Sequence, residues 1–415
     1  MVALTVGAGT LAAGPTRPRT AAQRLAERND AEGPLAQSVW GFCAVSTKGD
    51  TLVWLNPERR MVPASNMKLI TTGAALLRLG GGYRYHTQFA TDGEVQDSVL
   101  TGSLYIVGGG DPLVGNLFSY LPKPDDTFGK WSRILKDKGI KEIQGDIVGD
   151  GSWFGGELTH TDWSSEDLRT RDGVVPSGLT WRGKMGDTIP DGPYPAALHY
   201  LEWLRADSTI FVSGTAREGR ADSLTVLGDL QSPPLRDIAG IANRQSDNFM
   251  AETLLKTLGK NICGDDSYGK SLDALHKALS PLGLMGPSGQ MRFADGSGLS
   301  RKNYISPSFM VRYLLAMARG KAWKDFLGSL PFPGERRTTL ERRLPKAPYE
   351  LRHRIRMKSG SMNGVRCFSG YILPGDGSTQ GIIAFSLLTN NAVGSNAQVY
   401  PVLDAMIEAL AHENE

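Results

Sequence analysis

The feature that most constrains this chain is a set of three short polar motifs, spread across most of its 415 residues. In order they are Ser65-Asn66-Met67-Lys68, Ser246-Asp247-Asn248 and Lys358-Ser359-Gly360. A second serine–lysine pair of the same spacing, Ser267 and Lys270, shows that a single motif is weak evidence. Only the set that begins at Ser65 has all three motifs in this order. We therefore interpret the three as one constellation.

The first motif is expected at the start of a helix. Pro63 cannot continue a strand ladder, and apolar residues between Leu69 and Leu79 recur at helical spacing before three glycines end the element. Ser65 and Lys68 then lie on the same face, one turn apart. A lysine can take the serine proton once desolvation or a second nearby cation lowers its pKa. The motif is therefore suited to nucleophilic catalysis by Ser65.

The pattern of elements predicts an α+β fold. Strand-like runs at 38–46 and 51–55 form a hairpin signal, and the last third holds an alternating strand, two apolar strands and a closing amphipathic helix at 398–412. An antiparallel sheet flanked by helices follows from this order. Beyond His86, short alternating runs are broken by Gly, Asp and Pro. We predict one discontinuous domain formed by 21–85 and 192–415, with an inserted β-rich domain at 86–191.

Composition excludes several classes of protein. The content of 40% hydrophobic and 21% charged residues is that of an ordinary globular protein. A net charge of +3 gives no electrostatic footprint for nucleic acid, and the mixed-sign stretch from Glu335 to Arg343 is interpreted as a solvated loop or helix face. The chain has no run of 18 apolar residues, so no transmembrane helix is predicted.

The N-terminus and the cysteines give only weak information about export and about the redox compartment. Residues 1–20 are interpreted as the remnant of an export signal followed by a linker, because the first 14 are small and apolar but lack a basic start. Cys43, Cys263 and Cys367 are too few and too scattered for a disulfide framework or a zinc site. One bridge with one cysteine left over and three free thiols are both open. The redox compartment is therefore undecided.

The first and third motifs each have a physical task in acyl transfer. A helix start at Ser65 supplies a free backbone N–H and a positive dipole end where an oxyanion forms. The N–H of Ser361 is the natural second donor. Lys358 and Ser359 can hold a substrate carboxylate, while the charge of Lys358 keeps the surroundings of Lys68 electropositive.

The second motif completes the set. Ser246 can relay a proton to the leaving amine, and Asn248 can bond Lys68 and the substrate amide. The alternatives are purely structural roles: a helix cap for Ser65, an ordinary polar turn for the second motif, and an exposed strand lysine for Lys358. Each alternative is reasonable singly. The joint occurrence of SxxK, SDN and K[ST]G in this order, as in penicillin-binding proteins and class A β-lactamases, favours catalysis.

Longer stretches around the motifs resemble one family. The chain is similar, over nearly everything after residue 35, to the D-alanyl-D-alanine carboxypeptidase/endopeptidase family, the class C low-molecular-mass penicillin-binding proteins. The stretches are PASNMKLITT around Ser65, GGGDPL at Gly108 to Leu113, GDIVGDGSWF at Gly145 to Phe154, PPLRDIAGIANRQSDNFMAE through Ser246, DGSGLSRKNYISP at Asp295 to Pro307, and KSGSMNGVRCFSGYI at Lys358 to Ile372.

The resemblance implies that the discontinuous domain, 21–85 and 192–415, is a penicillin-binding, transpeptidase-like catalytic domain. It also implies a serine-type D-Ala-D-Ala carboxypeptidase or endopeptidase with no metal or organic cofactor. Peptidoglycan stem peptides and β-lactam antibiotics are the implied partners, in a periplasmic or otherwise extracytoplasmic location. It also implies that Ser359, Gly360 and Ser361 contact the substrate. Asp150 is implied to face the amino-bearing side chain of the substrate; the alternative is a plain turn aspartate. The two serines stand where threonines are usual, and the surroundings of Cys367 are less typical.

Two other functions are alternatives. A class A serine β-lactamase needs a glutamate after the second motif, and none occurs between 253 and 334. We therefore expect penicillin to acylate Ser65 and to stay bound. The other alternative is a non-catalytic cell-wall-binding protein of the same fold. The sequence ranks neither carboxypeptidase against endopeptidase action nor diaminopimelate against lysine in the stem peptide, and it leaves the oligomeric state open.

Overall fold

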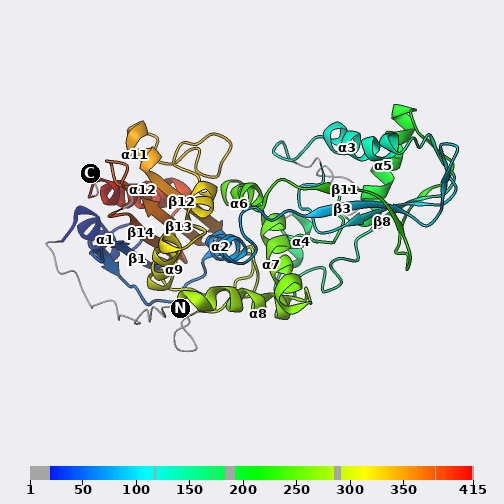
Figure 1. The fold of residues 1–415 in the computed structure, drawn as a ribbon. Coiled ribbons are helices and arrows are strands. Elements are labelled where there is room, and N and C mark those ends of the chain that lie inside the picture. Colours follow the sequence, from blue (N-terminus) through cyan, green and yellow to red (C-terminus); the bar gives the residue numbers. More distant parts are fainter. Residues whose placement is uncertain are drawn as a thin grey trace, which may run out of the picture.

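The structure, a computed structural model, describes residues 19–115, 118–170, 172–182, 192–284, 291–378 and 380–413. Most of the segment interpreted as an export signal and linker lies outside these residues. Figure 1 shows two parts side by side, one holding the first and last described residues and the other formed by the middle of the chain. Among the described residues, no helix combines the length and apolarity that crossing a bilayer requires.

The first part is built on a five-stranded antiparallel sheet with the order β12-β13-β14-β1-β2. Its strands are β1 (Val39–Ser46), β2 (Thr51–Leu55), β12 (Ile355–Met362), β13 (Val365–Ile372) and β14 (Ile383–Asn390). β1 pairs with β14 so that Val39 lies opposite Asn390. The two ends of the chain therefore share one sheet, and the predicted α+β fold with an antiparallel sheet is confirmed.

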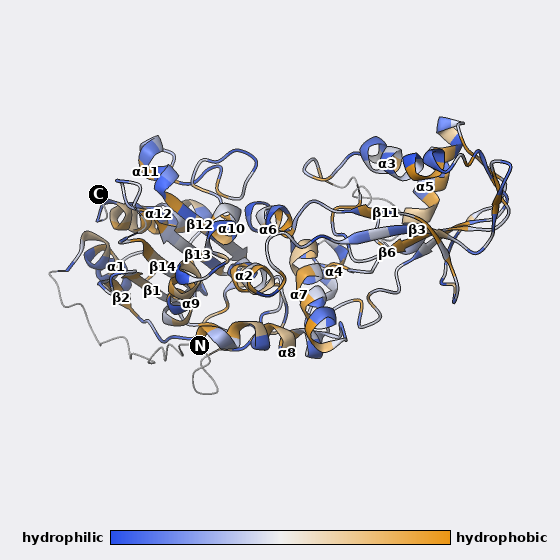
Figure 2. Ribbon diagram, in the orientation of Figure 1, coloured by the Kyte–Doolittle hydropathy of each residue, from blue (hydrophilic) through white to orange (hydrophobic). Residues whose placement is uncertain are grey.

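Helices cover both faces of this sheet. α1 (Ala21–Ala31) and α12 (Asn396–His412) pack on one face through a core that includes Ala26, Phe42 and Leu403. α2 (Met67–Leu79) and α9 (Pro307–Arg319) lie on the other face, where the Tyr313 hydroxyl donates to the Leu69 carbonyl oxygen at 2.8 Å. β14 is buried along its whole length because both faces are covered. Figure 2 shows apolar residues along these strands and helices.

Further helices of this part lie between α2 and β12 in the sequence. They are α6 (Leu235–Arg244), α7 (Asn248–Cys263), α8 (Tyr268–Leu279), the short η2 (Ser280–Leu282), α10 (Trp323–Ser329) and α11 (Tyr349–Arg354). α2 packs against α6 and α7 at the centre of the molecule. All three cysteines are free thiols, two of them buried, so no disulfide bridge forms.

The second part contains two sheets and three helices among the described residues. Its elements are β3 (His86–Thr91), β4 (Val95–Gln96), β5 (Val99–Leu100), β6 (Leu104–Gly108), α3 (Pro124–Asp137), β7 (Glu142–Ile143), β8 (Ile147–Asp150), α4 (Ser165–Arg169), α5 (Pro193–Asp207), β9 (Phe211–Val212), β10 (Ala216–Glu218) and β11 (Thr225–Gln231). One sheet has the order β10-β8-β6-β3-β11, and the smaller one β4-β5-β7-β9.

The inserted part ends later than the predicted boundary at 191. α5 packs on β8 and β10 rather than on the first sheet, and its Tyr200 shares a core with Phe89. β10 and β11 complete the larger sheet of the insertion, so the insertion runs from 86 to 231. The boundary was placed too early because β11 is largely exposed and gives little apolar signal, while α5 has the pattern of any helix packed on a core.

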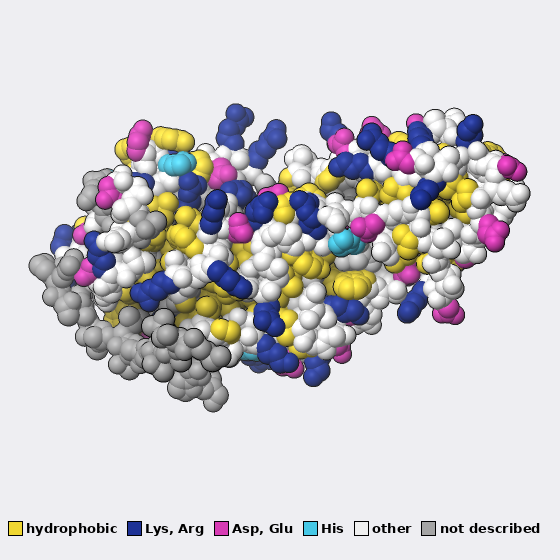
Figure 3. Space-filling model, in the orientation of Figure 1, with side chains coloured by type: hydrophobic (Ala, Val, Ile, Leu, Met, Phe, Trp, Pro, Cys, Tyr) yellow, Lys and Arg dark blue, Asp and Glu magenta, His cyan; other side chains and the backbone are white. Residues whose placement is uncertain are grey.

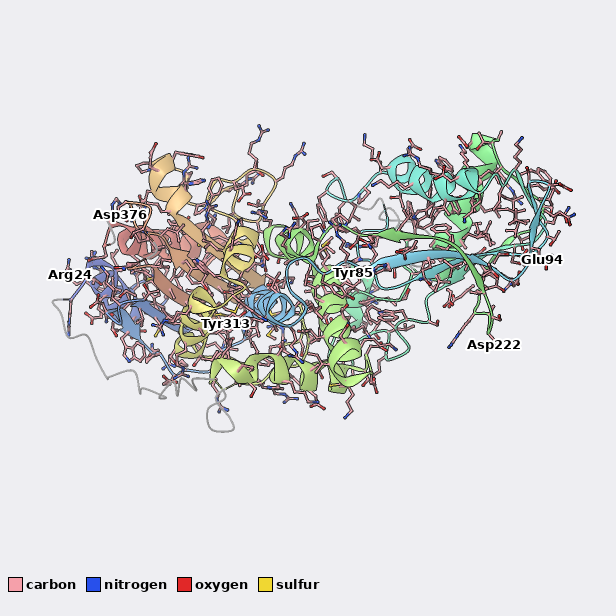
Figure 4. All side chains as sticks on the ribbon, in the orientation of Figure 1. Arg24, Tyr85, Glu94, Asp222, Tyr313 and Asp376 are labelled. Carbon is pink, nitrogen blue, oxygen red and sulfur yellow. The ribbon has the colours of Figure 1, made fainter. Side chains whose placement is uncertain are left out.

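The two crossings of the chain between the parts lie side by side. The Ser232 N–H donates to the Tyr85 carbonyl oxygen at 2.9 Å, and the Tyr85 N–H donates to the Ser232 hydroxyl at 3.0 Å. The Tyr85 hydroxyl is 3.0 Å from that of Thr257 on α7, which ties the crossing to the first part. Figure 4 shows Tyr85 where the two parts meet.

Candidate active site

Ser65 lies in a tight turn between the sheet and α2. The 3₁₀ turn η1 (Ala64–Asn66) leads directly into α2, as expected for a serine at a helix start. Ala64 has a φ of +46°. A Cβ on Gly298 would lie 1.9 Å from the Ala64 carbonyl oxygen, and one on Gly360 would lie 2.7 Å from that of Pro63. Only glycine fits at these two contacts, so neighbouring segments fix the turn from two sides.

Lys68 is fully buried and its ammonium group contacts three oxygens. Its Nζ lies 3.0 Å from the Ser65 hydroxyl, 2.6 Å from Asn248 Oδ1 and 2.8 Å from the Ser297 carbonyl oxygen. Burial lowers the pKa of Lys68 to about 8, although the carboxylates of Asp295 and Glu252 oppose the shift. The lysine is therefore placed, and its pKa adjusted, to accept the Ser65 proton near neutral pH.

The second motif occupies the break between α6 and α7. Ser246 has a φ of +58°, and the Asp247 carboxylate caps α7 by accepting from the Met250 N–H. Asn248, the first residue of α7, accepts from Lys68 and donates through Nδ2 to the Asp172 carbonyl oxygen at 2.8 Å. The break directs Ser246 and Asn248 toward the first and third motifs.

The inserted part holds this break in place. Asp247 Oδ2 accepts from Arg182 Nη2 at 3.0 Å and from the Tyr120 hydroxyl at 2.7 Å, and both donors come from the insertion. The Arg182 and Asp247 side chains are 5% and 2% exposed. Burial tends to raise the pKa of Asp247, but the Arg182 charge and these hydrogen bonds hold it below its ordinary value. The second motif is thus anchored from outside its own domain.

The third motif lies on β12, the edge strand of the sheet. Lys358 Nζ, fully buried, donates to the Ser246 hydroxyl at 2.9 Å and to the Ser359 carbonyl oxygen at 2.6 Å. Burial, and then the charge of Lys68, lower the pKa of Lys358 well below its ordinary value. The Ser359 hydroxyl donates to that of Thr339 at 2.7 Å. The structure thus joins the three motifs through two hydrogen-bonded pairs, Lys68 with Asn248 and Lys358 with Ser246.

A cavity of about 410 Å³ opens onto these residues. Its lining includes Ser65, Ser246, Ser359 and Ser361, and it continues along the loop before β12; the other lining residues are Thr338, Thr339, Glu341, Arg342, Arg343, Phe368 and Tyr400. The predicted role of Glu335 to Arg343 as a merely solvated stretch is therefore wrong in part, because this loop forms one wall of the cavity. Figure 3 shows Lys and Arg side chains gathered along the middle of this face of the molecule.

The structure adds three residues to the site that the sequence did not predict: Asp295, Thr339 and Arg182. Asp295 accepts from two backbone N–H groups of the loop that touches the Ser65 turn, and also from Trp163 of the insertion. Thr339 pairs with Ser359, and Arg182 anchors Asp247. The only signal for Asp295 was its place in the stretch DGSGLS. No local pattern marks the other two.

Three other positions singled out in the sequence, Asp150, Lys270 and Cys367, have described side chains that make no hydrogen bond to the side chains of the three motifs. Asp150 ends β8, is 4% exposed and accepts from the Ser152 N–H at 2.8 Å, as a turn aspartate does. Its contact with substrate therefore stays a prediction. Lys270 of the second serine–lysine pair lies at the surface beside Asp273, away from any such network. Cys367 is buried on β13, opposite Gly360 of the third motif.

Comparison with known proteins gives one consistent result. The family model described as the D-Ala-D-Ala carboxypeptidase 3 (S13) family matches residues 21–188 and 202–412. A D-alanyl-D-alanine carboxypeptidase from Actinomadura sp. (strain R39) is 26% identical, over 92% of this chain and 85% of its own.

Two solved structures share the fold. Penicillin binding protein 4 from Haemophilus influenzae gives a TM-score of 0.78 at 19% identity, covering 94% of this chain and 98% of that one. Bd3459, described as a predatory peptidoglycan endopeptidase from Bdellovibrio bacteriovorus, gives 0.59 at 17% identity, covering 91% and 94%.

Proposed function

The chain belongs to the D-Ala-D-Ala carboxypeptidase 3 (S13) family, and from that premise we propose how its residues perform serine-type DD-carboxypeptidase and endopeptidase chemistry. Ser65 is the nucleophile and Lys68 the base. The observation that supports this assignment most strongly is the fully buried Lys68 Nζ, 3.0 Å from the Ser65 hydroxyl, with its pKa lowered to about 8. A nucleophile and a base within hydrogen-bond reach are what covalent catalysis requires.

Acylation begins with transfer of the Ser65 proton to Lys68 as Oγ attacks the carbonyl carbon between two D-alanines. The oxyanion is stabilised by the N–H groups of Ser65 and Ser361; one such donor typically contributes about 10²- to 10³-fold in rate. Lys358 and Ser359 hold the C-terminal carboxylate of the substrate. This carboxylate pairs with the Lys358 ammonium and so keeps it charged.

The leaving amine departs with a proton that began on Ser65. Lys68 returns that proton through Ser246, whose hydroxyl accepts from Lys358 at 2.9 Å. The C–N bond breaks, D-alanine leaves, and Ser65 carries the acyl group as an ester. A water molecule then attacks the ester while Lys68 takes its proton, and Ser65 regains a proton as the peptide acid leaves. Asn248 holds Lys68 and meets the substrate amide.

Peptidoglycan stem peptides are the proposed substrates, in a periplasmic or otherwise extracytoplasmic location. β-Lactams are the proposed covalent inhibitors, because their strained amide places a carbonyl and a carboxylate at the same two subsites. The Haemophilus influenzae relative has been solved in complex with a β-lactam. Glu252, which follows the second motif, accepts from the Gly296 and Ser297 N–H groups, so it is engaged in holding a loop. We therefore expect slow deacylation of penicillin.

Labelling with a fluorescent penicillin tests this assignment. Purified wild type, Ser65→Ala and the control Ser267→Ala are incubated with the reagent and followed on gels for an hour. A lasting band in wild type and in the control, but none in Ser65→Ala, supports the proposal. A band that fades quickly indicates a β-lactamase. No band from folded wild type favours the non-catalytic wall-binding protein.

A further inference from the structure

The cavity at Ser65 extends well beyond the space that one alanine needs. Its volume of about 410 Å³ lies in the range of roughly 300–1,000 Å³ typical of sites that bury drug-sized ligands. Its lining also includes the Ser359–Thr339 hydroxyl pair and, on the loop that carries Thr339, Arg342 and Arg343. We call the part of the cavity beside these two arginines the far section. A substrate that ends in a single D-alanine leaves this far section unfilled.

The far section lies on the leaving-group side. Lys358 and Ser359 are the proposed ligands of the carboxylate of the departing residue, and Thr339 is bonded to Ser359 at 2.7 Å. Arg342 follows Thr339 by three positions on the same loop and lines the same cavity. A group attached to the departing residue, and not the acyl group that stays on Ser65, therefore meets Arg342.

The two arginines of this section differ in their contacts. Arg343 lies 3.5 Å from the Asp404 carboxylate and stacks over Tyr400, with its guanidinium carbon 4.0 Å from the ring centroid. It is therefore engaged in holding the loop against α12. Arg342 is exposed and has no hydrogen bond or ion pair with any residue that the structure describes. Its guanidinium is available to a ligand, and this group fits carboxylates with two parallel hydrogen bonds.

We propose that Arg342 is a specificity-determining residue that binds a carboxylate on the leaving peptide, so that this enzyme favours cleavage of cross-linked peptides with an acidic leaving strand over release of D-alanine. The inference rests on the proposed function of Ser65 and its neighbours. It adds a ligand class, an acidic peptide, to the far section of the cavity. Endopeptidase action is then the preferred use of the site.

The test compares three substrates with wild type, Arg342→Ala and Arg336→Ala. Arg336 is an exposed arginine of the same loop that does not line the cavity, so its variant removes the same charge elsewhere. The substrates are a stem pentapeptide that releases D-alanine, a cross-linked peptide dimer, and that dimer amidated at every leaving-strand carboxylate except the one on the departing residue, which Lys358 and Ser359 are proposed to hold. Steady-state kcat/KM is measured for each pair, and penicillin labelling is recorded in parallel.

We expect Arg342→Ala to lower kcat/KM for the acidic dimer about tenfold or more, the size of a lost hydrogen bond to a charged group. The loss is expected to be at least five times smaller for the pentapeptide and for the amidated dimer, and absent with Arg336→Ala. Equal losses on all three substrates, or an equal loss with Arg336→Ala, overturn the proposal. Absence of Ser65-dependent labelling in wild type is a separate result and contradicts the proposed function instead.

Discussion

The pH dependence of Ser65 acylation follows directly from the burial of Lys68. Lowering the pKa of this lysine from its ordinary 10.5 to about 8 reduces the free energy of deprotonating it at neutral pH by about 3 kcal/mol. The base must be neutral to accept a proton. With a pKa of about 8, about 9% of the enzyme is active at pH 7 and about 90% at pH 9. The acylation rate should therefore rise about tenfold over this interval and then level off.

The measurement is the acylation rate constant at saturating penicillin or peptide, taken by stopped flow from pH 6 to pH 9.5. Saturation matters because the rate then reports the enzyme–substrate complex, in which the bound carboxylate keeps Lys358 charged. An increase of about a hundredfold from pH 7 to pH 9, with no levelling, would show an ordinary lysine. A flat profile would show that another group is the base. Either result refutes the reasoning.

The exposed carboxylate of Asp172 allows the direction of the electrostatic effect on the pKa of Lys68 to be tested. The Asp172 charge raises the pKa of Lys68, although less than Asp295, Glu252 and Asp247 do. Asp172→Asn removes that charge and leaves its backbone carbonyl to accept from Asn248. The rising limb should therefore move to lower pH, and the shift should be smaller in salt than at low ionic strength. A shift to higher pH contradicts the electrostatic account.

Three further outcomes are expected. Gly360→Ala places a Cβ 2.7 Å from the Pro63 carbonyl oxygen, so β12 is displaced from the Ser65 turn and penicillin acylation falls at least tenfold while circular dichroism stays native; unchanged labelling contradicts this. Arg182→Met leaves Asp247 buried without its cation, and urea unfolding should show a loss of about 3–5 kcal/mol, largely recovered in Arg182→Met with Asp247→Asn. Burial raises the pKa of the Cys367 thiol to about 12, so iodoacetamide should modify the partly exposed Cys263 before Cys367. Mass spectrometry of the native protein measures the order of modification, and early modification of Cys367 would contradict its burial.

Much of the site could be predicted because its residues occur within short motifs on regular elements. Helical periodicity placed Ser65 at the start of α2, and strand alternation placed Lys358 on β12. The conformation of Ser246 could not be predicted in this way. No glycine or proline marks the break between α6 and α7 at Gln245 to Asp247, where Ser246 adopts a left-handed conformation. That break depends on Arg182 and Tyr120, which are distant in sequence.

The two errors share a physical cause. The predicted end of the insertion at 191 is too early, because α5 has the pattern of any helix with one buried side and the sequence does not indicate which sheet that side contacts. The mixed charges of the stretch from Glu335 to Arg343 predict a solvated loop or helix face. Its place on the wall of the cavity results from Arg343 stacking on Tyr400 of α12, a contact that no local pattern carries. The sequence predicts the type of each element, but it does not predict which other element that element packs against.

The pairing of β1 with β14 has a consequence for when the enzyme can first exist. Val39 lies opposite Asn390, 351 positions later, so one edge of β1 stays unpaired until the chain through β14 is available to pair with it. Pairings this distant in sequence slow folding and prolong the exposure of unpaired strands. A chain stopped before β14 holds Ser65, Lys68 and Ser246 but lacks the strand that joins β13 to β1. Penicillin reactivity should therefore appear only once β14 is available to pair with both β13 and β1.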